Sequence, residues 1–210
     1  LLFDIGATNM RIAVSHDGET ILEQKIIPTP PDFTEGIKAF KNCARELCGD
    51  MIINAAAGGV PGILNKDKTV LLSAPNLEGW EDVLLKEAIE KALDITVHLE
   101  NDAALAGLGE AVYGAGRGHR VVAYLTVGTG VGGVRIVNRK IDEKSSRFEP
   151  GHRVIIPGGL RCSCGGRGHL EAYVSGGAFR RKYGMHPERI KNARAWDEAA
   201  RMLARGAYHI

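Results

Sequence analysis

Short apolar runs separated by turn residues open the chain. Leu1–Asp4, Met10–Ser15 and Ile21–Ile27 are mostly apolar, and Gly, Asn or Asp-Gly separates each run from the next. Pro28 then begins a proline-rich break, after which Thr34–Cys48 repeats its apolar residues at helical spacing. The pattern predicts three strands followed by an amphipathic helix.

The same two patterns alternate through the rest of the chain. The expected strands are Ile52–Ala57, followed by a glycine-rich stretch, Thr69–Ser73, Ile95–Leu99, Val121–Val127 and Val134–Val137. The expected helices are Trp80–Leu93, Ala103–Val112 and Trp196–Ala204. A cysteine- and glycine-rich loop precedes the last helix. Strands and helices are therefore both expected in each half of the sequence.

Charge and composition narrow the class of protein. Lys and Arg number 27 against 25 for Asp and Glu, so the net charge is +2. So small a charge argues against a protein that binds nucleic acid or a membrane surface through a strong positive potential. No apolar stretch approaches the ~18 residues that cross a bilayer, and the start of the chain lacks a secretory pattern. The four cysteines are therefore expected to be reduced thiols of a cytoplasmic protein.

The segment Asp4-Ile5-Gly6-Ala7-Thr8-Asn9 joins the first two expected strands. Its glycine permits close approach of the backbone, and Thr8, Asn9 and neighbouring N–H groups can meet phosphate oxygens. Asp4 can hold Mg²⁺ through water, because Mg²⁺ gives up its water reluctantly. A plain hairpin turn with a capping aspartate is the alternative interpretation.

A second glycine-rich turn lies at Thr126–Gly133 and includes Thr129 and Gly130. A dinucleotide-binding fingerprint requires a helix next, but Val134–Val137 is β-branched and extended. The segment is therefore expected to be a phosphate-facing hairpin, with a flexible glycine hairpin as the alternative. Two such hairpins in tandem resemble the actin, hexokinase and heat-shock ATPase architecture, in which two related lobes enclose ATP.

Glu100-Asn101-Asp102 stands between an expected strand and a helix of small residues. Either Asn101 or Asp102 can serve simply as the N-cap of that helix. In a sugar kinase, a carboxylate in this position can instead accept the proton of the attacking hydroxyl.

Two thiols and two imidazoles occur close together near the glycine-rich loop. His152, Cys162, Cys164 and His169 form a complete ligand set for tetrahedral, structural Zn²⁺. Four protein ligands leave no open position, so a catalytic zinc is disfavoured. Unrelated cysteines and surface histidines are the alternative interpretation.

These motifs together resemble the ROK family (repressor, open reading frame, kinase), which includes bacterial glucokinases and N-acetylmannosamine kinases. The resemblance rests on Asp4–Arg11, Pro61-Gly62, Asn76–Trp80, Glu100-Asn101-Asp102, Gly128–Gly133, Glu149–His152 and Cys162–Glu171. It implies an α/β, actin-like ATPase (ribonuclease H-like) fold with two lobes. Residues 1–102 would form the first lobe, and residues 103–210 would begin a second, incomplete lobe that carries the zinc-binding substrate loop.

The resemblance also implies a role for each matching residue. Asp102 would be the general base toward the sugar 6-hydroxyl, and a zinc ion would order the substrate loop, with His152 offering its second ring nitrogen to the sugar. The implied sugar contacts are Gly62, Asn76, Asn101, Glu149, His152 and Glu171. The implied phosphate and magnesium contacts are Asp4, Gly6, Thr8, Asn9, Thr129 and Gly130.

Because the chain departs from the family pattern, we consider three hypotheses for its function. The family usually has Gly where Ala7 stands and a third Cys where His169 stands, and it continues beyond Ile210 into a Gly-rich corner that holds the adenine. The leading hypothesis is an ATP- and Mg²⁺-dependent hexose kinase, expected as a homodimer with glucose as its first candidate substrate. The alternatives are a sugar-responsive transcriptional repressor and an inactive sugar-binding fragment.

Overall fold

The structure is a computed structural model that describes residues 1–74, 76–77, 79–142 and 148–210. Glu78 of the Asn76–Trp80 motif therefore lies outside the described residues. The chain divides into two units, Leu1–Leu105 and Ala106–Ile210. The assignment of residues 1–102 and 103–210 to two functional lobes stays a prediction.

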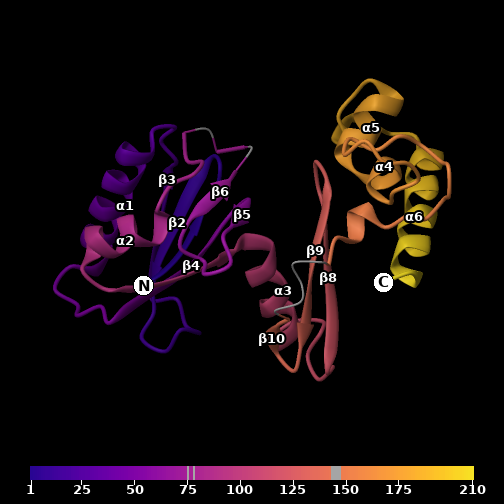
Figure 1. Ribbon diagram of the computed structural model, residues 1–210. Helices are drawn as coiled ribbons and strands as arrows, with labels where there is room; N and C mark the ends of the chain where they lie inside the picture. Colours follow the sequence, from indigo (N-terminus) through magenta and orange to yellow (C-terminus); the bar gives the residue numbers. More distant parts are fainter. Residues whose placement is uncertain (75, 78, 143–147) are drawn as a thin grey trace. The chain divides into compact units, whose positions relative to one another are not determined.

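Unit 1 is built on a five-stranded sheet with the order β3-β2-β1-β4-β7 (Figure 1). Its strands are β1 (Leu2–Ile5), β2 (Asn9–Val14), β3 (Glu23–Pro28), β4 (Ala55–Val60) and β7 (Thr96–Asn101). The first three form an antiparallel meander, whereas β1, β4 and β7 are parallel neighbours. The carboxyl ends of the three parallel strands therefore lie at one edge of the sheet, where α/β proteins commonly bind ligands.

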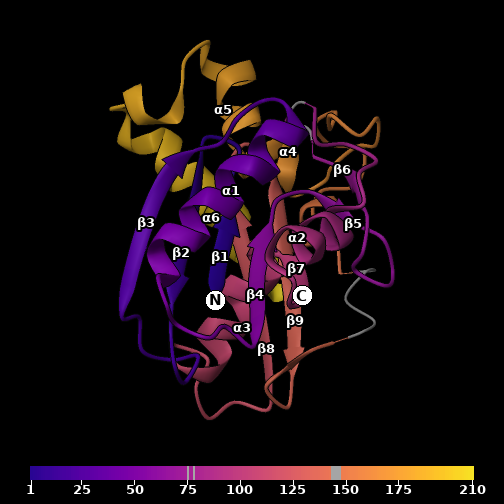
Figure 2. The ribbon, with the colours of Figure 1, turned by 90° about the vertical axis from the view of Figure 1, so that its left-hand side faces the viewer.

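Helices make the crossovers that parallel strands require. Helix α1 (Phe33–Cys48) leads from β3 to β4. Between β4 and β7 the chain forms β5 (Ile63–Leu64), β6 (Leu71–Ser73) and α2 (Leu85–Leu93). Figure 2 shows α1 and α2 in front of the sheet strands, and the buried core there includes Phe40, Trp80 and Ile89.

The expected strand Ile52–Ala57 was placed too early, because β4 runs from Ala55 to Val60. Ile52 is 89% exposed, so it lies in the loop that precedes β4. The strand instead continues through two glycines that were expected to lie beyond it. A Cβ at Gly58 would lie 2.3 Å from the Phe3 ring, so only glycine fits against that side chain in the sheet interior.

The expected helix Trp80–Leu93 is also shorter, since α2 begins at Leu85. Val83 pairs with Leu71 of β6 as an isolated bridge, and Asp82 has a φ of 53°. Trp80 is fully buried, and its Nε1 donates to the carbonyl of Pro30 at 3.0 Å. The apolar residues of this stretch thus serve core packing and strand pairing, although their spacing matched a helix.

Unit 2 combines an antiparallel sheet with a group of helices. Its sheet has the order β10-β9-β8, formed by β8 (Val121–Val127), β9 (Val131–Val137) and β10 (Lys140–Ile141). Its helices are α4 (Glu171–Val174), α5 (Gly176–Tyr183), α6 (Ala193–Tyr208) and the short 3-10 turns η2 (Pro150–His152) and η3 (Pro187–Arg189). Helix α3 (Asp102–Val112) begins in unit 1 and continues into unit 2.

Three features of unit 2 differ from expectation. Strand β9 begins at Val131, whose neighbours are glycines, because it pairs with all of β8. Helix α6 is longer than the expected Trp196–Ala204, and Asn192 caps its start by accepting from the N–H of Arg194. Helices α4 and α5 were not foreseen. None of the helices in the described residues is long and apolar enough to cross a membrane.

Candidate active site

The turn between β1 and β2 is held in place by the end of β3. The N–H of Gly6 donates to the carbonyl of Asn9 at 2.9 Å. Thr29 adds two bonds, since its hydroxyl donates to the carbonyl of Gly6 at 2.7 Å and its N–H to that of Thr8 at 3.0 Å. A Cβ at Gly6 would lie 3.0 Å from the Asn9 carbonyl oxygen. The expected phosphate turn is thus a defined loop at the edge of the sheet, fixed by Thr29, a residue that the sequence did not single out.

Asp4 lies on β1 beside this turn, with its side chain half exposed. Its Oδ2 accepts from Arg11 Nη1 at 2.8 Å, across the β1–β2 pair. A carboxylate that keeps one face open to water suits a cation bound through water molecules. The magnesium role of Asp4 stays a prediction.

Asn101 and Asp102 occupy the end of β7 and the start of α3. Asn101 Oδ1 accepts from the N–H of Ala104 at 3.1 Å, so Asn101 is a helix cap, as the sequence allowed. Its Nδ2 donates to the carbonyl of Gly62 at 3.1 Å, joining the carboxyl ends of β7 and β4. Asp102 Oδ1 accepts from the N–H of Ala103 at 2.7 Å.

The surroundings of Asp102 raise the pKa of its carboxyl group above that of an ordinary aspartate. Loss of water around its carboxyl raises the pKa of Asp102, the Asp4 carboxylate raises it further, and the Ala103 N–H opposes both. The residue retains exposed surface, so this desolvation is partial. A Cβ at Gly59 would lie 3.2 Å from the Asp102 Cα. Because position 59 on β4 is a glycine, the backbone of Asp102 can pack closely against this strand.

Gly62 and Asn76 lie on the segment that follows β4. Gly62 has a φ of 93°, and a Cβ there would lie 2.0 Å from the carbonyl oxygen of Ser73. Only glycine fits this backbone. Asn76 is exposed in the turn after β6, and no hydrogen bond among the described residues joins it to Asn101 or Asp102. The structure thus joins Gly62 to Asn101 but leaves Asn76 without a direct link to them.

In unit 2, the loop between β8 and β9 is attached to the start of α5. The N–H groups of Gly176 and Gly177 donate to the carbonyls of Gly128 and Thr129 at 2.7 and 3.0 Å. Ser175 caps the helix, accepting from the N–H of Ala178 at 3.0 Å. This hairpin is therefore not a free glycine loop. The Ser-Gly-Gly segment that anchors it was missed, although a serine before a helical run is a common N-cap signal.

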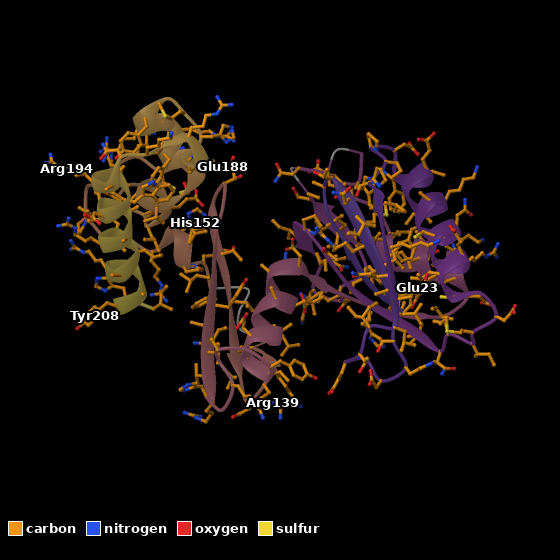
Figure 3. All side chains as sticks on the ribbon, turned by 180° about the vertical axis from the view of Figure 1, so that it is seen from behind. Glu23, Arg139, His152, Glu188, Arg194 and Tyr208 are labelled. Atoms are coloured by element: carbon orange, nitrogen blue, oxygen red, sulfur yellow. The ribbon has the colours of Figure 1, made fainter. Side chains whose placement is uncertain are left out.

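The four expected zinc ligands converge within unit 2. His152, labelled in Figure 3, ends η2, and its ligand atom, together with those of Cys162, Cys164 and His169, lies within 4.8 Å of every other. Cys162 Sγ is 4.0 Å from His152 Nδ1, and Cys164 Sγ is 3.2 Å from His169 Nδ1. Ligands of tetrahedral zinc lie roughly 3.3–3.8 Å apart at ordinary bond lengths. The donor chemistry fits a Zn²⁺ ion, and shifts of about 1 Å or less would bring the four ligand atoms to the spacing of a bound ion.

Glycines shape the loop that carries these ligands. The N–H of Cys162 donates to the carbonyl of Gly166 at 2.9 Å, closing a tight turn. A Cβ at Gly166 would lie 2.3 Å from His169 Cε1, and one at Gly168, where φ is 73°, would lie 1.8 Å from the carbonyl oxygen of Ile156. The glycines therefore let His169 reach the cysteines.

Gly166→Ala is expected to lower the zinc affinity of the full-length protein by about 10- to 100-fold, because the added methyl group displaces His169. Zinc per chain, measured by elemental analysis during titration with a chelator, checks this. Gly109→Ala is the matched control, because its Cβ would meet no atom within 4 Å. Equal zinc retention by both variants would contradict the expectation.

Glu171 connects the cluster of zinc ligands to the β8–β9 hairpin. Its Oε2 accepts from the N–H of Val131 at 2.9 Å, and its Oε1 accepts from the hydroxyl of Ser163 at 2.9 Å. Partial burial alone would raise the pKa of Glu171, but these two donors and the nearby His152 ring outweigh it, and the pKa lies below its usual value. Glu149 is exposed just before η2. Glu171 is thus a charged link between the two loops of unit 2.

Comparison with known proteins gives one family for almost the entire chain. The sequence profile of the ROK family matches residues 2–208. A glucokinase of Streptomyces coelicolor is 35% identical over 180 residues, which cover 84% of this chain and 56% of that protein. A xylose repressor of Bacillus subtilis is 37% identical over 118 residues, covering 55% of this chain and 30% of the repressor. The chain thus spans about half the length of the glucokinase.

Solved structures agree with the fold. A ROK hexokinase from Thermus thermophilus has a TM-score of 0.85 at 30% identity, covering 98% of this chain and 74% of that one. A ROK glucokinase from Streptomyces griseus, in complex with glucose and AMPPNP, has a TM-score of 0.66 at 34% identity, covering 85% and 58%. The expected actin-like α/β fold is confirmed.

Proposed function

The chain belongs to the ROK family, and from this premise we propose that the full-length protein transfers the terminal phosphoryl group of ATP to the 6-hydroxyl of a hexose. The observation that carries the proposal is the position of Asp102, a partly desolvated carboxylate at the carboxyl ends of the parallel strands β1, β4 and β7, close enough to Asp4 to feel its charge. The glucokinase relatives, and the glucose and AMPPNP bound in one related structure, support this reaction.

Asp102 would act as the general base. Its raised pKa makes the carboxylate a better proton acceptor than an ordinary aspartate. Asn101 fixes the start of α3, so the carboxylate is carried by a rigid element. A base held in this way can take the proton of the sugar hydroxyl as the bond to phosphorus forms.

The two turns would handle phosphate and metal. Asp4, Gly6, Thr8 and Asn9 would meet phosphate oxygens and water-bound Mg²⁺ in unit 1, and Thr129 with Gly130 would do so in unit 2. The bonds from Thr29 and from the start of α5 support this role, since they hold each turn through its carbonyl oxygens. Phosphoryl transfer depends mainly on such positioning and on neutralised charge.

A zinc ion would organise the substrate loop. His152, Cys162, Cys164 and His169 would hold it, and it would supply structural rigidity without an open coordination position. Glu149, His152 and Glu171 of unit 2 would then contact sugar hydroxyls. The family resemblance implies the same role for Gly62, Asn76 and Asn101 of unit 1. The two bonds that Glu171 accepts hold its carboxylate in one orientation, which supports a positioned acceptor for a sugar hydroxyl.

A coupled ADP-release assay of full-length, zinc-loaded protein tests the proposal. The panel contains glucose, N-acetylmannosamine, N-acetylglucosamine, mannose and fructose, and we expect hexose-dependent turnover with glucose as the first candidate, at a kcat on the order of 1–100 s⁻¹. Absence of turnover with every sugar would refute the kinase. Binding of a hexose without turnover would favour the sugar-responsive repressor, which the xylose repressor relatives keep as the second candidate.

A further inference from the structure

We propose that Lys68 and Glu100 form a positioning pair that sets the hexose affinity of the site, an inference that rests on the proposed kinase function. Lys68 Nζ donates to Glu100 Oε1 at 2.7 Å. The same oxygen accepts from the N–H of Asn101 at 2.8 Å. One carboxylate oxygen therefore binds both the lysine and the backbone that carries Asn101 and Asp102.

The Lys68–Glu100 pair attaches a short arm of the chain to the end of β7. This arm, residues 61–73, contains β5 and β6 and is attached at two points. Near its base, the Gly62 carbonyl accepts from Asn101 Nδ2. At its tip, Lys68 reaches Glu100. Because both attachments end on adjacent residues of β7, the arm and the start of α3 form one rigid piece beside Asp102.

The tip of the arm is folded to present the lysine. Lys68 has a φ of 56°, a left-handed conformation that costs energy for a residue with a Cβ. Asn65 supports it, because its Oδ1 accepts from the N–H groups of Thr69 and Val70 at 2.7 and 3.0 Å and its carbonyl accepts from that of Lys68 at 3.0 Å. The ordered turn fixes the Lys68 backbone at a place from which its ammonium reaches Glu100.

Burial separates this pair from ordinary surface ion pairs. The side chain of Glu100 is only 18% exposed, whereas that of Lys68 is 43% exposed, so a half-buried carboxylate is compensated by a cation that reaches in from the surface and by the Asn101 N–H. Glu100 of the pair accepts from the Asn101 N–H, and Asn101 in turn donates to the Gly62 carbonyl, so the pair supports two proposed sugar contacts. The turn between β1 and β2 is instead held by Thr29. Loss of the pair should therefore weaken hexose binding and leave ATP binding unchanged.

Lys68→Met tests this in the full-length protein. We expect the hexose Kd, measured by calorimetry, and the hexose KM to rise about tenfold, with the ATP KM within about twofold of wild type. Lys68→Arg retains the cation and should restore most of the affinity. Lys25→Met is the matched control, because it breaks a Lys–Glu pair of the same unit, with Glu46, between β3 and α1.

The outcomes separate the two proposals. An active wild type with an unchanged hexose Kd and KM in Lys68→Met overturns the positioning pair alone, as does an equal rise in Lys25→Met. A rise in the ATP KM as large as that for hexose also overturns it, because a general loss of structure would then explain both. A wild type that neither turns over nor binds any hexose of the panel overturns the proposed function and this inference with it.

Discussion

Asp102→Asn is expected to lower kcat for hexose phosphorylation by about 10²- to 10⁴-fold in the full-length protein. The amide retains the shape of the side chain and can still accept from the Ala103 N–H, but it cannot take a proton from the sugar. Steady-state kinetics with ATP and the preferred hexose check this. Asp50→Asn, at an exposed aspartate in the turn after α1, is the control and should be indistinguishable from wild type.

The stability of the Asp102→Asn variant distinguishes lost chemistry from lost folding. Because the folded protein raises the pKa of Asp102, the ionised carboxylate destabilises the folded state at neutral pH, and this effect disappears as the pH falls through the folded pKa. The neutral amide carries no such penalty. Its free energy of unfolding at pH 7 should therefore equal or exceed that of wild type, and a large decrease would make the kinetic result uninformative about the base.

The raised pKa also predicts the acid side of the wild-type pH profile. A base must be ionised, so kcat/KM should begin to fall at a higher pH than an ordinary aspartate would give. Near-normal turnover in Asp102→Asn, with folding intact, would show that another group accepts the proton.

Cys162→Ser is expected to abolish stoichiometric zinc binding and to lower hexose kcat/KM by about 100-fold or more. Cys162 is buried among the four ligands, and burial raises the pKa of its thiol, so the metal must displace a bound proton. Elemental analysis of protein purified without chelator should find about one zinc per wild-type chain and none in the variant. Cys48→Ala, at a buried cysteine of α1, is the control and should retain the metal.

A second measurement follows zinc loss without relying on activity. Glu171 links the ligand loop to Val131 through Ser163. When the ligand loop loosens, the amide of Val131 should lose protection against hydrogen exchange, while amides of the unit 1 sheet keep theirs. Zinc-free wild-type protein with unchanged exchange at Val131 would show that the metal does not support this hairpin.

Local chemistry made most of the site readable from the sequence. The predicted zinc ligands lie within eighteen positions along the chain, His152 to His169, and soft donors on a glycine-rich loop have few other roles. The two turns that we predict to bind phosphate were recognisable as hairpins because each follows a strand and precedes another. Asn101 was foreseen as a helix cap because a polar residue before a helical run satisfies free N–H groups.

The sequence alone did not predict the conformation of residues whose packing partners are distant along the chain. Trp80 matched a helical pattern, yet a carbonyl fifty residues away receives its Nε1–H. Gly58 and Gly59 were expected to lie beyond the strand, but they are the interior of β4, where Phe3 leaves no room for a Cβ at Gly58 and Asp102 leaves little at Gly59. Helix propensity and turn preference are local, and tertiary packing overrode both.

The sequence by itself determined the family, most of the strands and longer helices, and the identity of the chemical groups, because these depend on residue type and short spacing. The tertiary structure alone decided which groups contact one another: Thr29 on the turn between β1 and β2, Gly176 and Gly177 on the β8–β9 hairpin, and Lys68 on Glu100. Each of these contacts arises because parallel strands or packed loops bring together residues far apart in the chain, and their distances follow from the fold as a whole.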